Sequence, residues 1–554
     1  IYRGLVGSEM CIRDRLRGKF MKGNMQNMDL TIPKLIEHAE RYTSDTLIVS
    51  RETDNSILKK TTGECLNQSR KIAKLLQSLK VGKGDRVATI AWNNSRHFEI
   101  YFGVTGMGGV LHTINPRLFP EQLIYILNHA EDKVVFVDDT FLPLIEGVQD
   151  HLEFSPVIIL MGPKKEINFD IKNLHFYDEM VEQSDPISDW VEVDEGDAAA
   201  LCYTSGTTGN PKGVLYSHRS TMLHTWASGN ALRFDTTSSV LPVVPMFHVN
   251  AWGTPYAALM TGCKLILPGQ ALDGASLFEL ISAENPNILM GVPTVWLGLL
   301  NYLSEQNLTL QGVDSVMVGG SAAPLAMIKE FNEKHNTFLV HGWGMTEMSP
   351  LGTMNLQTKK MKELPDEERY ELQTKQGYPL FGVEIKIVDD ANNELARDGS
   401  AQGALLVRGP WIIESYFKSD SPAVDDEGWF DTGDVAKIFP DGCMQIMDRS
   451  KDVIKSGGEW ISSIDLENAA VGHPDVEEAC VVGVPHPKWD ERPILLVICK
   501  GDLDKDSINE FLADKVAKWW LPDDIIKVEE LPHGATGKLL KVELREQYKE
   551  HLME

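Results

Sequence analysis

The chain has 554 residues, which is more than one hydrophobic core usually organises, so at least two domains are expected. A hydrophobic fraction of 43% and a charged fraction of 24% are typical of globular proteins and exclude a disordered or collagenous chain. With 80 Asp and Glu against 53 Lys and Arg, the net charge of −27 repels phosphate backbones and anionic lipid, which argues against nucleic acid as a partner.

The seven cysteines are scattered and include no Cys-x-x-Cys pair. Their odd number, in a chain of this size, favours reduced thiols over a disulfide framework or a zinc site, and therefore a cytoplasmic location. No apolar run reaches the roughly 18–20 residues needed to cross a bilayer, so no transmembrane segment is expected.

Residues 1–20 do not begin with Met and are rich in Arg. A transit peptide is one interpretation, although Ser is scarce and Glu9 and Asp14 interrupt the basic pattern. A secretory signal is disfavoured because the segment lacks an apolar core. We expect a non-native or disordered extension upstream of a start at Met21 or Met25.

From Ile32 onward, short β-rich runs alternate with amphipathic helical stretches. The pattern predicts strands over 86–90, 110–114 and 133–137, and helices over 95–105 and 120–129. This alternation is typical of a parallel sheet covered by helices on both faces, and it resumes after residue 197. No period of 20–50 residues repeats, which excludes solenoids and propellers.

Near Tyr378 the pattern changes to Gly- and Pro-rich sequence with alternating polarity. Antiparallel strands are predicted over 383–388, 403–408, 437–439 and 444–446, the last two joined by turn residues at 440–442. After Asp448 a compact α+β tail of about a hundred residues follows. We therefore expect an N-terminal body over 21–447 and a C-terminal domain over 448–554.

The most informative segment is the run Tyr203-Thr-Ser-Gly-Thr-Thr-Gly-Asn-Pro-Lys-Gly213, which follows a predicted buried strand. Its glycines permit a tight turn, its hydroxyl groups are donors, and Lys212 adds a positive charge, so the loop can surround phosphate oxygens. It is not the G-x-x-x-x-G-K-[ST] loop, because Gly213 follows the lysine. A flexible linker is the alternative, disfavoured because the loop lies between a buried strand and a segment predicted to be helical.

This segment resembles the phosphate-binding motif of the adenylate-forming superfamily, which includes acyl-CoA synthetases, adenylation domains and luciferases. Further motifs of that family follow in its order: Gly319-Gly-Ser-Ala-Ala-Pro324, Gly342-Trp-Gly-Met-Thr-Glu347, Trp429-Phe-Asp-Thr-Gly-Asp434, Asp448-Arg449 and Pro532-His-Gly-Ala-Thr-Gly-Lys538. The resemblance extends to nearly the whole chain. It implies an α/β fold with a large N-terminal body of parallel-type sheets and helices plus a distorted β-barrel, and a small mobile α+β C-terminal domain hinged at Asp448.

The resemblance also implies roles for individual residues. Catalytic roles fall to Lys538, Glu347, Thr346 and Lys212, and Mg²⁺ is expected on Glu347 and Thr204. The expected nucleotide-binding residues are Thr204, Ser205, Gly206, Thr207, Thr208, Gly209, Gly319, Gly320, Ser321, Ala322, Gly342, Trp343, Gly344, Met345, Asp434 and Arg449. Taken singly, Glu347 is compatible with an ordinary surface carboxylate, Asp434 with a turn residue and Lys538 with a solvated lysine; the ordered motifs favour the functional interpretation.

The segment Pro245-Met-Phe-His-Val-Asn-Ala-Trp-Gly253 is the one expected to select the acyl group. It contains no acid to pair with an α-ammonium, so an uncharged acid tail is expected. His248 is either a core histidine or a residue at the junction of acyl group and nucleotide, and Trp252 is predicted on the same helical face, capping the acyl tunnel. The expected acyl-binding residues are His248, Val249, Trp252, Gly253 and Gly319.

The acceptor side is suggested by Lys455, Ser456, Gly457, Gly458 and Glu459, which resemble the loop lining the pantetheine tunnel of these enzymes. No carrier-protein domain follows within the sequence, so free CoA is the expected thiol. ATP, CoA and a small carboxylic acid are thus the expected partners, and a homodimer is left open.

The resemblance implies an acyl-CoA ligase that works in two steps, through acyl-AMP with release of pyrophosphate and then through displacement of AMP by CoA. Medium-chain fatty acids are the expected substrates, and 3-methylmercaptopropionate is the alternative. Two rivals are an amino-acid or aryl adenylation enzyme and a non-catalytic acyl or nucleotide binder. The retained Lys538 and Glu347 argue against the binder.

Overall fold

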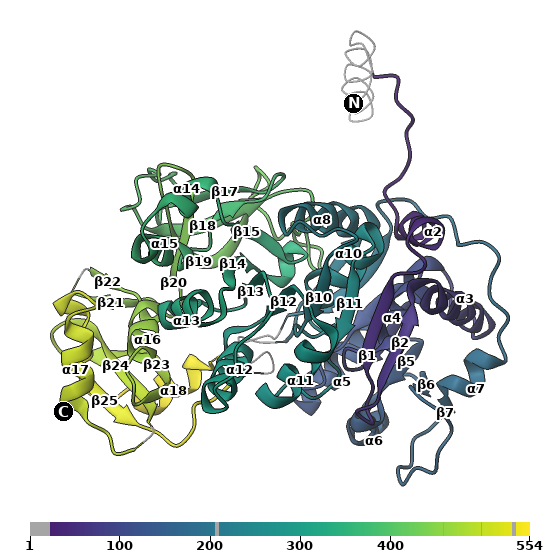
Figure 1. The fold of residues 1–554 in the computed structure, drawn as a ribbon, viewed down its shortest axis with the longest axis horizontal. Helices are drawn as coiled ribbons and strands as arrows, with labels where there is room; N and C mark the ends of the chain where they lie inside the picture. The colour runs from purple at the N-terminus through teal and green to yellow at the C-terminus, as the bar shows by residue number, and fades with distance from the viewer. Residues whose placement is uncertain (1–22, 205–209, 458, 500, 535–538, 554) are drawn as a thin grey trace, which may run out of the picture.

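The computed structural model describes residues 23–204, 210–457, 459–499, 501–534 and 539–553. The expected extension at 1–20, the loop residues Ser205–Gly209, Gly458 and Lys538 lie outside these ranges, so the expectations for them stay predictions. The fold is α/β, as expected. Figure 1 shows the sheet built from residues 454–527 at one end of the molecule and the sheet built from residues 86–217 at the other. No helix among the described residues combines the length and apolar character needed to span a bilayer.

The first sheet is seven-stranded, in the order β7-β6-β5-β3-β4-β8-β9. All its pairs are parallel except β8–β9. Its strands are β3 (Arg86–Ile90), β4 (Val110–Thr113), β5 (Val134–Val137), β6 (Val157–Leu160), β7 (Leu174–Phe176), β8 (Ala198–Tyr203) and β9 (Gly213–Ser217). Its connecting helices are α4 (Ser95–Gly106), α5 (Pro120–Ala130), α6 (Leu142–Val148) and α7 (Tyr177–Glu182). The predicted strands and helices of this region are confirmed to within a residue or two.

Side chains alternate between two cores along these strands. Val134 and Phe136 pack in the core shared with helices α3 (Thr62–Ser78) and α4, whereas Val135 and Val137 pack in the core beneath α5 and α6. Because both faces are covered, the strands are apolar at every position, which is why they were readable as buried parallel strands.

The central sheet is nine-stranded, in the order β16-β15-β14-β13-β12-β10-β11-β1-β2. Its strands are β1 (Leu47–Arg51), β2 (Ile57–Thr61), β10 (Ser239–Pro242), β11 (Lys264–Leu267), β12 (Ile288–Gly291), β13 (Ser315–Val318), β14 (Phe338–Gly344), β15 (Leu351–Asn355) and β16 (Tyr378–Pro379). The helices of this region are α2 (Ile32–Tyr42), α8 (His218–Ala231), α10 (Thr254–Thr261), α11 (Gly274–Glu284), α12 (Pro293–Glu305), α13 (Leu325–His335), α14 (Lys359–Glu363) and α15 (Asp366–Gln373). The five strands from β14 to β11 along this order run parallel, so their carboxyl ends share one edge.

A four-stranded antiparallel sheet follows, in the order β17-β18-β19-β20, where the resemblance implied a distorted barrel. Its strands are β17 (Glu384–Val388), β18 (Gly403–Arg408), β19 (Phe430–Ile438) and β20 (Met444–Arg449). The predicted turn lies between β19 and β20, where Gly442 has a φ of +89°. Glycine adopts this left-handed conformation without a steric penalty, which explains its place in the turn.

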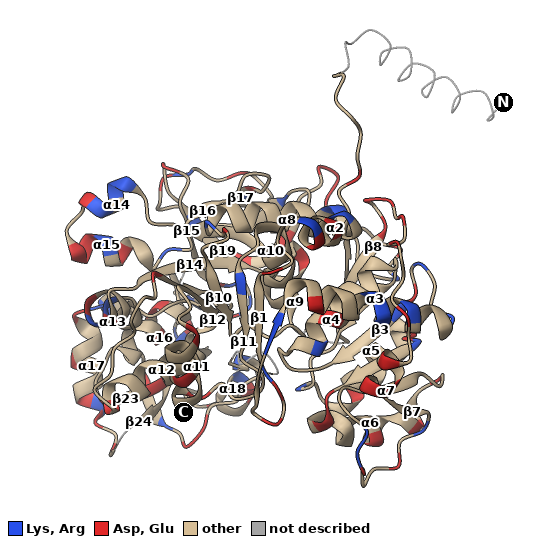
Figure 2. Ribbon diagram, turned by 45° about the vertical axis from the view of Figure 1, so that its right-hand side comes forward, with Lys and Arg blue, Asp and Glu red and all other residues tan. Residues whose placement is uncertain are grey.

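The remaining strands form a sheet of their own, in the order β22-β21-β24-β23 with β25 paired to β24. Its strands are β21 (Ile454–Ser456), β22 (Glu459–Ile461), β23 (Val476–His486), β24 (Asp490–Cys499) and β25 (Asp524–Lys527), and its helices are α16 (Ser463–Val471), α17 (Lys505–Ala513) and α18 (Lys541–Tyr548). Two hydrophobic clusters built from this part of the chain cover the two faces of the sheet. Figure 2 shows acidic positions along helices and loops throughout the described ribbon, in line with the net charge of −27.

Candidate active site

The phosphate-loop segment connects two antiparallel strands. Tyr203 at the end of β8 pairs with Gly213 at the start of β9. Just inside that pair, the Thr204 N–H donates to the Lys212 carbonyl at 2.9 Å and the Lys212 N–H donates to Thr204 Oγ1 at 3.1 Å. These bonds close the base of the loop and fix where it leaves the sheet.

The expectation that a helical segment directly follows this loop is wrong. The run Gly213–Ser217 is strand β9, and helix α8 begins only at His218. Val, Leu and Tyr at the centre of the run favour a strand, and the sheet edge offered by β8 supplies the hydrogen-bonding partner. Strands β8 and β9 therefore form an antiparallel pair that holds the two ends of the loop together.

Two further motifs meet at the carboxyl edge of the central sheet. Val318 is paired with His341 in adjacent parallel strands, so the loop Gly319–Ala322 starts beside Gly342. A Cβ added to Gly319 would lie 3.4 Å from the Gly342 carbonyl oxygen, and one added to Gly344 would lie 2.1 Å from the Pro350 carbonyl oxygen. Gly344 is therefore required sterically, because no real Cβ tolerates that approach to backbone. The edge position is where open α/β sheets bind ligands.

Glu347 lies in a short 3-10 turn, Thr346–Met348, directly after β14. Its side chain is buried, and its Oε1 accepts a hydrogen bond of 2.9 Å from the Tyr416 hydroxyl. Thr346 is held through its carbonyl, which accepts a 2.6 Å bond from the buried Tyr216 hydroxyl. Neither tyrosine was predicted from the sequence, because each reaches this turn from a distant segment.

The surroundings of Glu347 fit a divalent cation. Within the described part of the chain, no Lys, Arg or His side chain pairs with its carboxylate, and no three His, Cys, Asp or Glu residues are grouped to hold a metal by themselves. A buried carboxylate without a cationic partner is a ligand for a hard ion such as Mg²⁺, whose other ligands would be phosphate oxygens and water.

The expected ribose-binding residues lie together between the central and antiparallel sheets. Asp434 on β19 is 3% exposed, and its carboxylate accepts a 2.9 Å bond from the Trp343 indole N–H. The Arg449 guanidinium lies 3.0 Å from the same carboxylate. The structure therefore brings together Trp343, Asp434 and Arg449, although Trp343 lies 91 positions before Asp434 in the sequence.

The segment expected to select the acyl group is not an ordinary helix. The turn α9 (Val249–Trp252) has positive φ values at all four residues, between 41° and 55°, and Gly253 continues it at 79°. The prediction that His248 and Trp252 share one face of a right-handed helix is therefore wrong. Consecutive left-handed residues cost roughly 1–2 kcal/mol each relative to right-handed ones, so the surrounding structure must impose this turn.

The left-handed turn places the Trp252 ring beside Gly319, at the carboxyl edge of the central sheet. A Cβ added to Gly319 would lie 3.1 Å from the far edge of the Trp252 ring, so Gly319 leaves room for the indole. Gly253 packs against the buried His224, whose Nε2 accepts a bond from the Leu351 N–H. Burial lowers the pKa of His224 to about 3, so it is a neutral packing and acceptor group.

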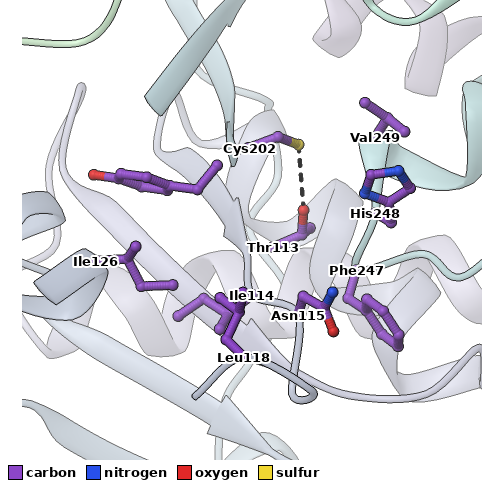
Figure 3. Close-up of a pocket in the computed structure, with 10 residues that line it drawn as sticks. Thr113, Ile114, Asn115, Leu118, Ile126, Cys202, Phe247, His248 and Val249 are labelled. Carbon is purple, nitrogen blue, oxygen red and sulfur yellow. Dashed lines mark hydrogen bonds between the residues drawn. The ribbon is translucent and has the colours of Figure 1, made fainter. Parts of the chain in front are cut away.

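A pocket opens between this segment and the first sheet (Figure 3). Phe247 and His248 lie on one side of it and Ile126 on the opposite side, while the Thr113 hydroxyl and the Cys202 thiol face each other at 3.4 Å. The described residues that line it include no Asp, Glu, Lys or Arg, and one of them is a histidine. They are Thr113, Ile114, Asn115, Leu118, Ile126, Cys202, Tyr203, Phe247, His248 and Val249.

The expected CoA-binding loop is carried by the C-terminal sheet. The Gly457 N–H donates to the Trp489 carbonyl at 2.8 Å, and a Cβ on Gly457 would lie 3.1 Å from the Trp489 ring. Trp489 and Trp519 meet edge to face at 4.8 Å beside this turn. Figure 1 shows β21 and β22 at the far side of the C-terminal sheet from β12–β14, so the structure does not bring Lys455–Gly457 to the carboxyl edge of the central sheet.

Asp448, the expected hinge, is bonded to the C-terminal unit. Its Oδ2 accepts bonds of 2.7 Å from the Ser463 N–H and from the Ser463 hydroxyl at the start of α16. Lys541, mostly buried at the start of α18, donates to the same hydroxyl and pairs with Glu467 at 2.7 Å. These buried bonds tie the end of β20 to two helices of the C-terminal sheet.

Known proteins resemble this chain in sequence and in fold. A family model described as AMP-binding enzyme matches residues 35–417, and the model of the AMP-binding enzyme C-terminal domain matches residues 465–538. A 3-methylmercaptopropionyl-CoA ligase from Ruegeria lacuscaerulensis is 50% identical over 96% of this chain and 100% of that protein. A medium-chain-fatty-acid–CoA ligase from Ectopseudomonas oleovorans is 48% identical over 96% of this chain and 98% of that protein. The solved structure of an anthranilate CoA ligase in complex with anthranoyl-AMP has a TM-score of 0.85 at 23% identity, covering 96% of this chain and 100% of that one, a likeness of fold alone.

The chain belongs to the AMP-binding enzyme family, and the resemblance inferred from its motifs is confirmed. Within that family it is an AMP-forming acid–CoA ligase. ATP and CoA are substrates consistent with this family. The individual site residues remain assignments by motif and geometry.

Proposed function

We propose that this ligase activates an uncharged short- or medium-chain carboxylic acid, with a medium-chain fatty acid as the first candidate. The observation that carries this proposal is the lining of the pocket beside Phe247 and His248, in which no described residue is Asp, Glu, Lys or Arg. Such a lining stabilises an apolar acyl chain by removing it from water, and its described residues offer no oppositely charged side chain to an α-ammonium or a second carboxylate.

A second candidate is 3-methylmercaptopropionate, favoured by the 50% identity to the Ruegeria enzyme. The paired Thr113 hydroxyl and Cys202 thiol give one wall of the pocket a weakly polar, polarisable character compatible with a thioether. A panel of C2–C16 acids and methylthiopropionate, assayed by pyrophosphate release, separates the two candidates. The first candidate requires an optimum among medium chains, and the second an optimum at methylthiopropionate.

In the first half-reaction, a carboxylate oxygen attacks the α-phosphorus of ATP, and the bond to the pyrophosphate oxygen breaks. We assign the Thr204–Lys212 loop and Lys538 to the phosphate charge, Thr346 to the α-phosphate, and Asp434 with Arg449 to the ribose hydroxyls. Mg²⁺, when bound through Glu347 and Thr204, supplies charge neutralisation. The transition state needs alignment and charge stabilisation more than acid–base help.

In the second half-reaction, the CoA sulfur attacks the acyl carbonyl carbon, and the bond to AMP breaks. We propose that the C-terminal domain, residues 448–554, turns about Asp448 to withdraw Lys538 and present Lys455–Glu459. The separate cores of the C-terminal sheet support its movement as a unit, and the position of Asp448 between the two bodies supports its role as the hinge. We also propose a cytoplasmic location, because the scattered cysteines of the chain favour reduced thiols over a disulfide framework.

Replacing Trp252 by Ala is expected to move the preferred acyl chain length upward. The indole lies over Gly319, where it would close the acyl tunnel, and each methylene accommodated beyond it contributes up to about 0.8 kcal/mol. The measurement is kcat/KM for acids of increasing length, with the exposed Trp226→Ala as a matched control. An unchanged length profile in folded Trp252→Ala protein would place the indole outside the tunnel.

A further inference from the structure

A short segment before the C-terminal body connects two of the motifs that handle phosphate. The Ile413 N–H donates to the Glu347 carbonyl at 2.8 Å, and the Phe417 N–H donates to the Gly213 carbonyl at 2.8 Å. Gly213 directly follows Lys212, and a Cβ on it would lie 3.0 Å from the Phe417 Cβ. Residues 413–417 thus fix the spacing between the base of the hairpin loop and the turn that carries Glu347.

The side chain of Tyr416 also connects these two motifs, because it contacts both the Glu347 carboxylate and the Lys212 ammonium. Its hydroxyl donates to Glu347 Oε1 at 2.9 Å, and the Lys212 ammonium lies 4.7 Å from the centre of its ring. One half-buried side chain therefore contacts both a carboxylate and a cation.

The contacts of Tyr416 with Glu347 and with Lys212 have different effects. A carboxylate that ligates a metal is oriented by the hydrogen bond it accepts, and loss of such a bond typically reduces metal affinity. Lys212 is an exposed residue with a long flexible stem, and a ring face beneath its ammonium restricts where the charge lies without neutralising it. An acidic partner in place of the ring would compete with phosphate for the lysine; an aromatic ring does not.

We infer that Tyr416 is a positioning residue for the ATP-dependent half of the reaction, orienting the Glu347 carboxylate through its hydroxyl and the Lys212 ammonium through its ring. The inference rests on the proposed roles of Glu347 and Lys212 in handling Mg²⁺ and phosphate. It gives the hydroxyl and the ring of Tyr416 separate functions. One substitution can remove the hydroxyl alone, and a second can remove the ring as well.

The test is calorimetric binding of ATP without carboxylic acid, so that no turnover occurs, in EDTA and over a Mg²⁺ titration. Tyr416→Phe keeps the ring, so it should bind ATP in EDTA as the wild type does but need about 10–100-fold more Mg²⁺ for the metal-dependent gain in affinity. Tyr416→Leu removes the ring as well, so its ATP affinity in EDTA should also fall, by about two- to fivefold.

The control variant is Tyr378→Phe. Tyr378 is also half-buried and donates to a carboxylate, that of Asp441, at 2.9 Å, but it is outside the proposed site. It should bind ATP as the wild type does under both conditions. Circular dichroism and thermal melting of every variant establish that it is folded.

A double-mutant comparison gives the sharpest readout. If the hydroxyl acts through Glu347, Tyr416→Phe should change nothing further in a Glu347→Gln background. A wild-type Mg²⁺ requirement in folded Tyr416→Phe, or an undiminished effect of Tyr416→Phe in the Glu347→Gln background, would overturn the inference. A wild-type protein that binds Mg²⁺ and ATP but releases no pyrophosphate with any acid would instead count against the proposed function.

Discussion

In a Lys538→Ala variant, acyl-AMP formation from acid and ATP is expected to fall by roughly 10²–10³. The reason is that Lys538 would neutralise the charge growing between the α-phosphate and the attacking carboxylate. It lies in the C-terminal part of the chain, beyond the proposed hinge at Asp448, whereas the proposed phosphate loop connects two strands of the first sheet. A charge on a movable domain can act in one conformation and be absent from the other.

The same variant, given synthetic acyl-AMP and CoA, is expected to form thioester near the wild-type rate. Rapid-quench measurement of each half-reaction provides the comparison, and Lys527→Ala, an exposed lysine of β25, is the matched control. Equal loss in both half-reactions would contradict domain alternation and point to a structural role for Lys538, or to one in binding both ligands.

A Glu347→Gln variant is expected to lose most adenylation activity while remaining folded. Gln preserves the shape of the side chain and can still accept the Tyr416 hydrogen bond, but it removes the negative charge that fits a divalent cation. Pyrophosphate release should fall steeply, most of all at limiting Mg²⁺. Thermal stability should be maintained, because the substitution removes a buried charge that pairs with no cation among the described residues.

The matched control for this substitution is Glu414→Gln, an exposed carboxylate two residues before Tyr416. It should show the wild-type dependence on Mg²⁺. Normal turnover by Glu347→Gln at limiting Mg²⁺ would show that the metal assignment is wrong.

The regular parts of the fold were predictable because local pattern and tertiary environment agree there. The run Val134–Val137 is apolar on both faces because helices cover both sides of the sheet, so its sequence alone indicates a buried parallel strand. The turn at Gly442 was predictable for a similar reason, since Pro, Asp and Gly favour that conformation locally.

The left-handed turn at Val249–Trp252 was not predictable from local preference. Val, Ala and Trp all disfavour positive φ, so tertiary contacts must impose the turn. Two such contacts are visible: Gly253 fits against His224, and the Trp252 ring fits over Gly319. The helical pattern seen in the sequence was therefore misleading at the segment expected to set specificity.

The motif residues of the site were predictable because their order along the chain resembles a family, yet their supports were not. Tyr416 is 69 positions from Glu347, and only the folded chain places it between that carboxylate and Lys212. Tyr216 reaches the Thr346 carbonyl in the same way, from β9. No spacing rule in the sequence connects these pairs.

The central claim, activation through acyl-AMP before CoA takes part, is tested most directly by exchange of labelled pyrophosphate into ATP in the absence of CoA. The account predicts exchange that requires both Mg²⁺ and a carboxylic acid accepted by the pocket, and that Lys538→Ala greatly slows. Exchange that is absent without CoA, or that proceeds equally well without any acid, would contradict it.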